Sequence, residues 1–368
     1  MSFFDDVLHE PRHEAVTQTL KSALQRSDGE VEASVVLRLD ADNDQWIDTG
    51  LHVQAGQEVS LLSEGVIWLS REYDIRIAGN AALWHRIGDG RIAKSAGRTT
   101  SFRAERSGPL QLACRLAGQW LDDSGALDPD APAMPMDGGL TVAAIVWEGA
   151  ATEGLAHLAA RDGTGLAAAE IGRIKASRPL PRGWEHLWRV GRTDIFCEAV
   201  DEDGGTALAC DCTADSGIIK HPVDAPLDDA ARLSWEWVVR SLPSPAPENT
   251  LITHDYMSIA VEFENGQDLT YFWSSSLPPE TTFRCPIPGW EQRETHVVVR
   301  SGPDEIGRWV SDARSILADY RRAVGGEIPR RIVGVWIIAL SPFQRRNGVA
   351  SYRNIRLASS AGETVIGP

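Results

Sequence analysis

The feature that most constrains the fold of this chain is the alternation of apolar and polar side chains in residues 254–263 and 294–300. Side chains of a β-strand point alternately to the two faces of its sheet, so this period of two predicts strands with one apolar and one polar face. The apolar positions of the first stretch are Met257, Ile259, Val261 and Phe263. A Glu-Asn-Gly-Gln turn at 264–267 leads to a further predicted strand at 268–274.

Short predicted strands separated by turns with Gly and Pro fill most of the remaining chain. This pattern is typical of β-sandwiches, and a length of 368 residues favours two domains. The predicted parts are a helical arm at 1–32, a sandwich at 33–149, an Ala- and Gly-rich helical linker at 150–177 and a second sandwich at 178–368.

Two further helices are indicated by apolar residues at helical spacing. In the N-terminal arm Val16, Leu20 and Leu24 share one helix face, which favours docking on the body of the protein or on a partner subunit. A helix at 303–325 is predicted to pack on the second sandwich. Its apolar face consists of Ile306, Trp309, Val310, Ala313, Leu317 and Tyr320.

The net charge of −16 and the pI near 5.0 argue against nucleic acid or an anionic membrane as a partner. No apolar run approaches the length of a membrane span, and the N-terminus lacks the basic and apolar regions of a signal peptide. We therefore expect a cytoplasmic protein. The five cysteines include no Cys-x-x-Cys pair, which predicts free, mostly buried thiols.

The first sandwich carries the pattern Trp46-x-Asp48-Thr49-Gly50-x-x-Val53-x-Ala55-Gly56-x-x-Val59, with Leu83-Trp84-x-x-Ile87-Gly88 after it. On these residues the stretch 33–149 resembles the PA-I-type galactose-binding lectin family. The resemblance implies a galactose-binding-like jelly roll. It also implies a calcium ion that holds the sugar hydroxyls in the loop corresponding to 115–139.

Calcium prefers hard oxygen ligands, and in this loop they would come from Asp122, Asp123, Asp128 and Asp130, with Asp122 and Asp123 as the first candidates. Arg115 and Leu116 stand where the lectins present an acidic ligand, and a cation there would oppose metal binding. The alternative is an ordinary solvated acidic loop. We therefore expect no resident cofactor, with calcium as the alternative.

Residues 178–358 carry a second set of motifs. They include Pro181-x-Gly183-Trp184, Leu233-Ser234-Trp235-Glu236-Trp237, Val299-Arg300-Ser301-Gly302 and Asp319-Tyr320. On these motifs the C-terminal half resembles an uncharacterised bacterial family, domain of unknown function 3047. The resemblance implies a jelly-roll-like sandwich and no particular activity. The fold expected for the whole chain is thus all-β, with two jelly-roll-like sandwiches joined by a short helical linker.

The polar face of the C-terminal strands is the candidate site, because it carries His, Tyr, Glu and Arg side chains. Glu262 and His296 are the predicted proton-transfer pair, since a carboxylate beside an imidazole can exchange protons near neutral pH. His254 and Glu236 are predicted to support them. The predicted substrate-binding residues are Tyr256, Asp268, Arg300, Trp290 and Glu294.

Two other interpretations of this face remain open. It is an ordinary solvated sheet face, or it is a site where His254, His296 and Glu262 bind a divalent metal. The sequence contains no nucleophile elbow for serine or cysteine chemistry, and no glycine loop in the context of a phosphate site.

Three functions follow from these observations. The favoured one is an enzyme that hydrolyses, eliminates or isomerises a small hydroxyl-rich or cyclic substrate, with the lectin-like domain as an accessory. The others are a non-catalytic carbohydrate-binding protein and an assembly module. An enzyme predicts a pocket with shifted carboxyl pKa values, whereas a sugar-binding protein predicts a shallow groove with exposed Trp. The expected partner is a small-molecule or saccharide-like ligand, and a homo-oligomer through the N-terminal arm stays open.

Overall fold

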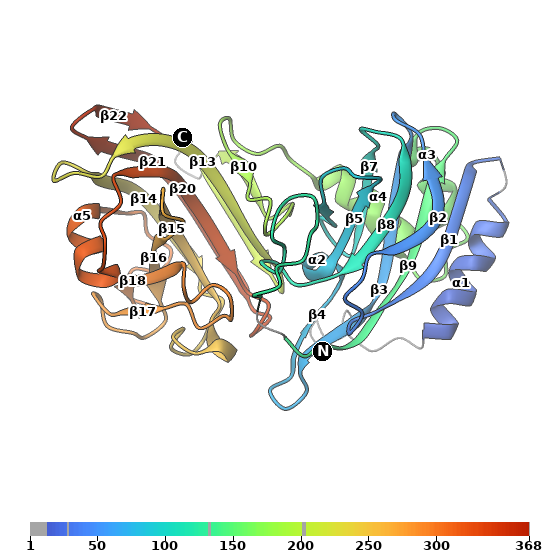
Figure 1. Ribbon diagram of the computed structural model, residues 1–368, viewed down its shortest axis with the longest axis horizontal. Helices are drawn as coiled ribbons and strands as arrows, with labels where there is room; N and C mark the ends of the chain where they lie inside the picture. The colour runs from blue at the N-terminus through green and yellow to red at the C-terminus, as the bar shows by residue number, and fades with distance from the viewer. Residues whose placement is uncertain (1–12, 28, 132–133, 201–203, 368) are drawn as a thin grey trace. The chain divides into compact units, whose positions relative to one another are not determined.

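The computed structural model describes residues 13–27, 29–131, 134–200 and 204–367, and they form two compact units (Figure 1). The first unit comprises residues up to 177 together with 191–193, and the second comprises 178–190 and 194–368. Residues 1–12 of the predicted helical arm lie outside the described residues. Among the described helices, none combines the length and the apolar character that a membrane span requires.

The first unit is a β-sandwich built from two sheets. One sheet pairs β1 (Val31–Asp40), β9 (Asp137–Trp147), β3 (Glu58–Ser70) and β4 (Ile75–Ile77), with β7 (Thr99–Arg103) joined to β3. The other pairs β2 (Ile47–Val53), β8 (Gly108–Cys114), β5 (Leu83–Ile87) and β6 (Ala93–Lys94), and the short helix α2 (Gly79–Ala82) precedes β5. Residues such as Leu61, Leu110 and Val142 from both sheets form the apolar core.

Three helices bury a second apolar face of the β9 sheet. They are α1 (His13–Gln25), α3 (Ala151–Ala159) and α4 (Leu166–Ala176). In one buried cluster, Leu20 of α1 and Leu155 and Leu158 of α3 pack with Ile145 and Trp147 of β9. The stretch predicted as a linker, 150–177, is therefore part of the first unit. Its alanines and glycines permit close helix packing, which the sequence composition alone does not distinguish from a linker.

Gly154 and Gly172 provide a matched test of this packing. A methyl group at Gly154 would overlap the buried ring of Trp147, whereas one at Gly172 would meet nothing within 4 Å. We expect Gly154→Ala to lower the free energy of unfolding by about 1–3 kcal/mol through overpacking. Gly172→Ala should instead raise it by about 0.5–1 kcal/mol, because Ala favours the helix. Urea unfolding of both variants checks this, and equal effects would contradict the packing described.

The second unit is also a β-sandwich. Its larger sheet, called here the site sheet, runs in the order β10 (Glu185–His186), β13 (Ser216–Pro226), β20 (Arg331–Leu340), β15 (Tyr256–Phe263), β16 (Asp268–Ser274), β18 (Glu294–Ser301) and β17 (Thr282–Arg284). The opposite sheet runs β11 (Phe196–Val200), β12 (Thr206–Thr213), β21 (Asn347–Ser359), β14 (Arg232–Ser241) and β19 (Val310–Ser315), with β22 (Gly362–Val365) beside β21. The prediction of a mostly β protein with two sandwiches is confirmed.

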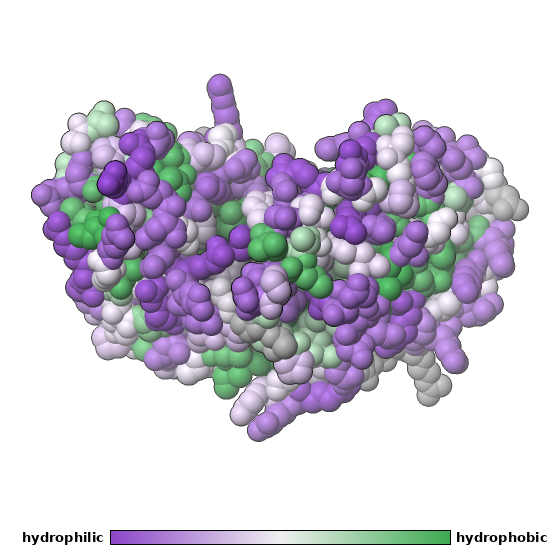
Figure 2. Space-filling model, in the orientation of Figure 1, coloured by the Kyte–Doolittle hydropathy of each residue, from purple (hydrophilic) through white to green (hydrophobic). Residues whose placement is uncertain are grey.

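Aromatic side chains from both sheets fill the core of the second unit. Trp235 stacks on Tyr271 with ring centroids 5.8 Å apart, and Trp237 lies 5.5 Å from Trp273. These pairs join β14 to β16 across the sandwich. Such rings account for several of the 13 tryptophans as core residues. On the surface, Figure 2 shows polar side chains over most of the visible face, with apolar ones in scattered patches.

The helix predicted at 303–325 is wrong over much of its length. Residues Val310–Ser315 form strand β19, which pairs with β14, and only α5 (Ile316–Asp319) and the π-helix η2 (Tyr320–Val324) are helical. In β19, half-buried Asp312 and Arg314 alternate with exposed residues. Pairing with an open sheet edge and burial of these two charged side chains override the helical spacing of the apolar residues.

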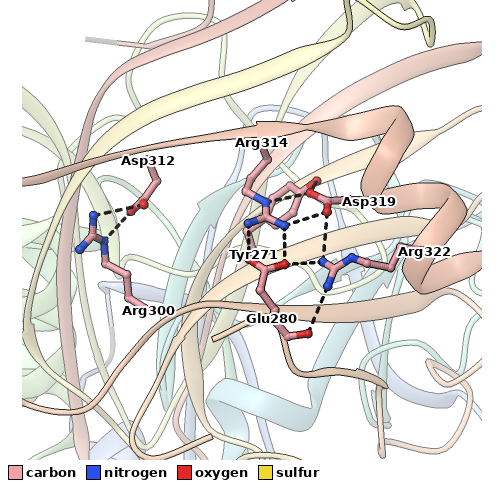
Figure 3. Close-up of polar contacts among 7 residues, drawn as sticks. All are labelled: Tyr271, Glu280, Arg300, Asp312, Arg314, Asp319 and Arg322. Carbon is pink, nitrogen blue, oxygen red and sulfur yellow. Dashed lines mark hydrogen bonds and ion pairs between the residues drawn. The ribbon is translucent and has the colours of Figure 1, made fainter. Parts of the chain in front are cut away.

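Charged side chains from β19 hold the edge of the second sandwich (Figure 3). Arg314 contacts Asp319 at 2.7 Å and Glu280 at 2.6 Å, and Arg322 contacts the same two carboxylates. Tyr271 donates a hydrogen bond to Asp319 Oδ2 at 3.2 Å. The network thus links β16, the turn at 280 and the start of the helical segment.

Asp319 is the buried centre of this network, so its loss should be costly. We expect Asp319→Ala to lower the free energy of unfolding by about 3 kcal/mol, because Arg314 would lose a partner where water is scarce. Glu363→Ala removes an exposed pair with Arg356 and should cost less than about 1 kcal/mol. Chemical unfolding measures both, and a cost for Asp319→Ala no larger than that control would contradict a stabilising role.

Candidate functional site

The outer face of the site sheet, opposite the sandwich core, carries the polar side chains predicted from the alternation. Glu262 on β15 is the cross-strand partner of Asp268 on β16, and Asp268 is the partner of Glu294 on β18. Three carboxyl-bearing residues therefore stand side by side on three adjacent strands. His296 follows on the same face, opposite Thr270.

This polar face is buried rather than solvated. Tyr256 is 2% exposed, Asp268 1%, Glu294 4% and His296 0%. The interpretation of the face as an ordinary wet side of an antiparallel sheet is therefore wrong for its β15–β18 part. Burial of this many ionisable groups is costly unless they are paired, neutral or bound to a ligand.

The two histidines meet on this face. The rings of His254 and His296 stack with centroids 4.7 Å apart and an interplanar angle of 26°. His254 lies just after the 3-10 helix η1 (Leu251–Thr253), ahead of β15, and reaches the ring of His296 on β18. Tyr256 and Phe283 pack edge-on or tilted against the ring of His296, at 4.8 and 4.9 Å.

Burial keeps both imidazoles neutral near pH 7. It lowers the pKa of His254 to about 4, although the hydrogen bond from its Nδ1 to the Glu248 carbonyl opposes the shift. The pKa of His296 is held well below its ordinary value by burial and then by the neighbouring His254. Neutral imidazole is the form that binds metal ions and accepts protons.

Two carboxyl groups on this face are shifted in the opposite direction. Burial, followed by repulsion from Glu294, holds the pKa of Asp268 well above its usual range. Burial also raises the pKa of Glu294, although Tyr256 and Thr270 donate hydrogen bonds to its Oε1 at 2.7 and 3.2 Å. Among the described residues, Oδ2 of Asp268 has no hydrogen-bond partner.

Cys285 belongs to this cluster, although sequence analysis did not select it. Its Sγ lies 3.4 Å from Nε2 of His254, and its backbone N–H donates to the Glu294 carbonyl at 3.0 Å. Burial raises the pKa of this thiol above its usual range. The donor atoms of His254, Cys285, Glu294 and His296 all lie within 4.8 Å of one another. A signal for Cys285 would have been the pairing of 282–284 with the strand at 294–301, but three residues are too few to predict a strand.

Glu262 does not join the two histidines. Its Oε2 contacts Lys220 Nζ at 2.6 Å and accepts a hydrogen bond from Trp336 Nε1 at 3.2 Å. Strand β16 lies between the strands that carry Glu262 and His296. In the strand pairing Glu262 is level with Glu294, which precedes His296 by two residues. The structure therefore does not bring together the predicted proton-transfer pair, nor the predicted metal set of His254, His296 and Glu262.

Three other predicted residues lie away from the cluster. Glu236 is on β14 of the opposite sheet, where Arg353 donates to it at 2.8 Å. A bulge at the end of β18 aligns Arg300 with Trp273, and Arg300 then contacts Asp312 at 2.7 Å (Figure 3). Trp290 is half-buried in the turn before β18, where its carbonyl accepts a hydrogen bond from the Glu294 N–H at 2.9 Å.

In the first unit, two carboxylates of the acidic loop have protein partners. Asp122 accepts hydrogen bonds from the backbone and hydroxyl of Ser124, at 2.9 and 2.6 Å. Asp123 pairs with Arg91 at 2.6 Å. Within residues 13–27, 29–131, 134–200 and 204–367, neither aspartate belongs to a group of three possible metal ligands. Calcium binding here stays a prediction.

Comparison with solved structures finds distant similarities. The N-terminal domain of EclA, described as a PllA-like lectin, is 17% identical, with 30% of this chain and 94% of that one covered and a TM-score of 0.23. The xyloglucanase domain of NopAA from Sinorhizobium fredii is 8% identical, with 42% and 83% covered and a TM-score of 0.29. The CBM22 tandem domain of Paenibacillus barcinonensis Xyn10C is 9% identical, with 90% and 86% covered and a TM-score of 0.22.

A resemblance to a lectin is thus found among solved structures, as expected from the sequence. The search of curated proteins found no match. Residues 183–356 match the model of a protein family described as "Protein of unknown function (DUF3047)". The resemblance of the C-terminal half to this family is thereby confirmed.

Proposed function

We propose that the second unit is an acid/base enzyme in which Glu262 reacts with a hydroxyl-rich, saccharide-like substrate at the outer face of the site sheet. The observation that carries the proposal is the position of Glu262. It is the member of the three-carboxyl row whose side chain reaches solvent, being 19% exposed, while Asp268 and Glu294 are buried.

The surroundings of Glu262 fix its carboxylate. Lys220 and Trp336 both contact Oε2. Within the part of the chain that the structure describes, these contacts leave Oε1 available to a ligand. Lys220 reaches Glu262 across β20 because Gly334, which lies between them, has no side chain. A carboxylate held by a cation and an indole N–H is oriented for proton transfer or nucleophilic attack.

Asp268 supplies the second carboxyl of the proposed pair. Directly opposed residues of antiparallel strands have Cβ atoms about 4.5–5.5 Å apart, and Glu262 and Asp268 are opposed in this way. A pair of neighbouring carboxyl groups is the arrangement used in glycoside hydrolysis. Asp268 also has an unpartnered carboxyl oxygen, Oδ2, among the described residues. These features favour hydrolysis over elimination or isomerisation.

Substitution of Glu262 tests the catalytic role. We expect Glu262→Gln to lower kcat/KM by about 10²–10⁴-fold on whichever aryl glycoside of glucose, galactose or xylose the full chain hydrolyses. The control is Glu236→Gln, which also removes the charge of a part-buried, Arg-paired glutamate, but on the opposite sheet. That variant should stay within about twofold of the unmodified chain. Full turnover by Glu262→Gln, or binding of sugars with no turnover by the unmodified chain, would contradict the proposal.

Gly334 gives an independent test, because it acts through space rather than charge. A methyl group at this position would lie 2.8 Å from Glu262 Oε2 and 2.9 Å from Lys220 Cε. These are the ends of flexible side chains, so the ion pair should shift while the sheet stays folded.

We expect Gly334→Ala to lower kcat/KM by about tenfold or more, with a change in the free energy of unfolding of less than about 1 kcal/mol. The control is Gly348→Ala in the same unit, which crowds Met257 on the core side instead. That variant should lose stability while its folded fraction stays active. The opposite pattern in the two variants would argue against a role for the Glu262 geometry.

A further inference from the structure

We propose that His254, Cys285, Glu294 and His296 form a zinc site that fastens three chain segments of the second unit together. The site is distinct from the proposed catalytic carboxylate Glu262 and does not depend on it. His254 follows η1, Cys285 follows β17, and the other two residues lie on β18. All four side chains are buried, and their donor atoms lie within 4.8 Å of one another.

His254 is oriented as a metal-binding histidine. Its Nδ1 lies 2.5 Å from the carbonyl oxygen of Glu248, which can only accept a hydrogen bond. The ring proton is therefore on Nδ1, and Nε2 carries a lone pair that faces Cys285 Sγ at 3.4 Å. A hydrogen bond from the far ring nitrogen to a backbone carbonyl is the usual support of a metal-bound imidazole.

His296 is the observation that points most directly to a ligand. It is fully buried, and neither of its ring nitrogens has a hydrogen-bond partner among the described residues. Leaving a buried polar atom unpaired costs free energy, and folded proteins rarely contain such an atom without a reason. Nε2 lies 3.6 Å from Glu294 Oε1, beyond hydrogen-bonding distance. An ion between these two atoms would bond to both.

The donor set suits zinc. A thiolate, two imidazole nitrogens and a carboxylate oxygen match the ligands of tetrahedral zinc, whose bonds are about 2.0–2.3 Å long. Such bonds place ligand atoms about 3.4 Å apart. The donor atoms here lie within 4.8 Å of one another, so two atoms at that distance would have to approach by about 1 to 1.5 Å when zinc binds. Zinc would be bound by the thiolate of Cys285 and the carboxylate of Glu294, and their two negative charges balance the two positive charges of the ion.

The surroundings favour a structural site rather than a catalytic one. Four protein ligands complete a tetrahedron and leave no open position for a substrate or a reactive water. Tyr256 and Thr270 donate hydrogen bonds to Glu294 Oε1 and so orient its carboxylate. The aromatic rings of Phe272 and Phe283 pack against the ring of His296. The ion would therefore link the segment before β15 to the β17–β18 hairpin.

The test begins with the purified full chain. We expect about one zinc ion per chain by elemental analysis, and X-ray absorption should show one sulfur at about 2.3 Å with nitrogen and oxygen neighbours at about 2.0–2.1 Å. Removal of zinc by a chelator should lower Tm, and added zinc should restore it. No stoichiometric zinc uptake, or zinc surrounded by oxygen alone, would overturn the proposal, and this measurement needs no variant.

Matched cysteine variants locate the site. Cys285→Ala should weaken zinc binding more than the 10–100-fold that loss of an outer partner costs, and should abolish the thiolate-to-cobalt absorption band of the Co(II)-substituted protein. Cys210→Ala removes an equally buried thiol of the same unit and should keep both properties. Unchanged zinc affinity and an unchanged cobalt band in Cys285→Ala would overturn the assignment. Glu262→Gln should retain zinc, so failure of the catalytic proposal is separable from failure of this one.

Discussion

Removal of ionisable groups from water on the outer face of the site sheet is the constraint on which the second unit depends. His254, Asp268, Glu294 and His296 are each less than 5% exposed. Isolated charges cost several kcal/mol in such a place, so these groups take neutral forms unless a partner compensates. The directions of their pKa shifts agree, with the two imidazoles lowered and the two carboxyls raised. Hydrogen bonds from Tyr256 and Thr270 to Glu294 satisfy only part of this cluster.

The alternation in the sequence brings two histidines into the polar phase, and the structure places these two on this face. His254 and His296 are 42 positions apart, yet both lie in the polar phase of their segments, and their rings stack. The two rings do not meet through neighbouring strands. Strand β16 lies between β15 and β18, and His254 reaches His296 from the turn that precedes β15.

Other features of the site could not be predicted from alternation. Alternation along a strand shows which of its side chains share a face, but not which sheet the strand joins. Glu236 on the opposite sheet therefore matched the pattern equally well. One bulged residue reverses parity, and such a bulge at the end of β18 moves Arg300 toward Trp273. The sequence did not indicate Cys285 as a site residue, because its position is set by the three-residue strand β17. All three depend on strand pairing, which a single sequence specifies weakly.

The three carboxyl groups of the row differ in the cation that is close enough to compensate their charge. Glu262 has Lys220 as its counter-ion, because the absent side chain of Gly334 opens a path over β20. Glu294 would have the proposed zinc ion. Asp268 stands between them, fully buried, with repulsion from both neighbours opposing its ionisation. Since like charges on adjacent strands oppose one another in so dry a place, ionisation is least favourable for the middle carboxyl. With a cation at each end of the row, the middle carboxyl would be the proton donor beside the exposed carboxylate in the proposed acid/base reaction.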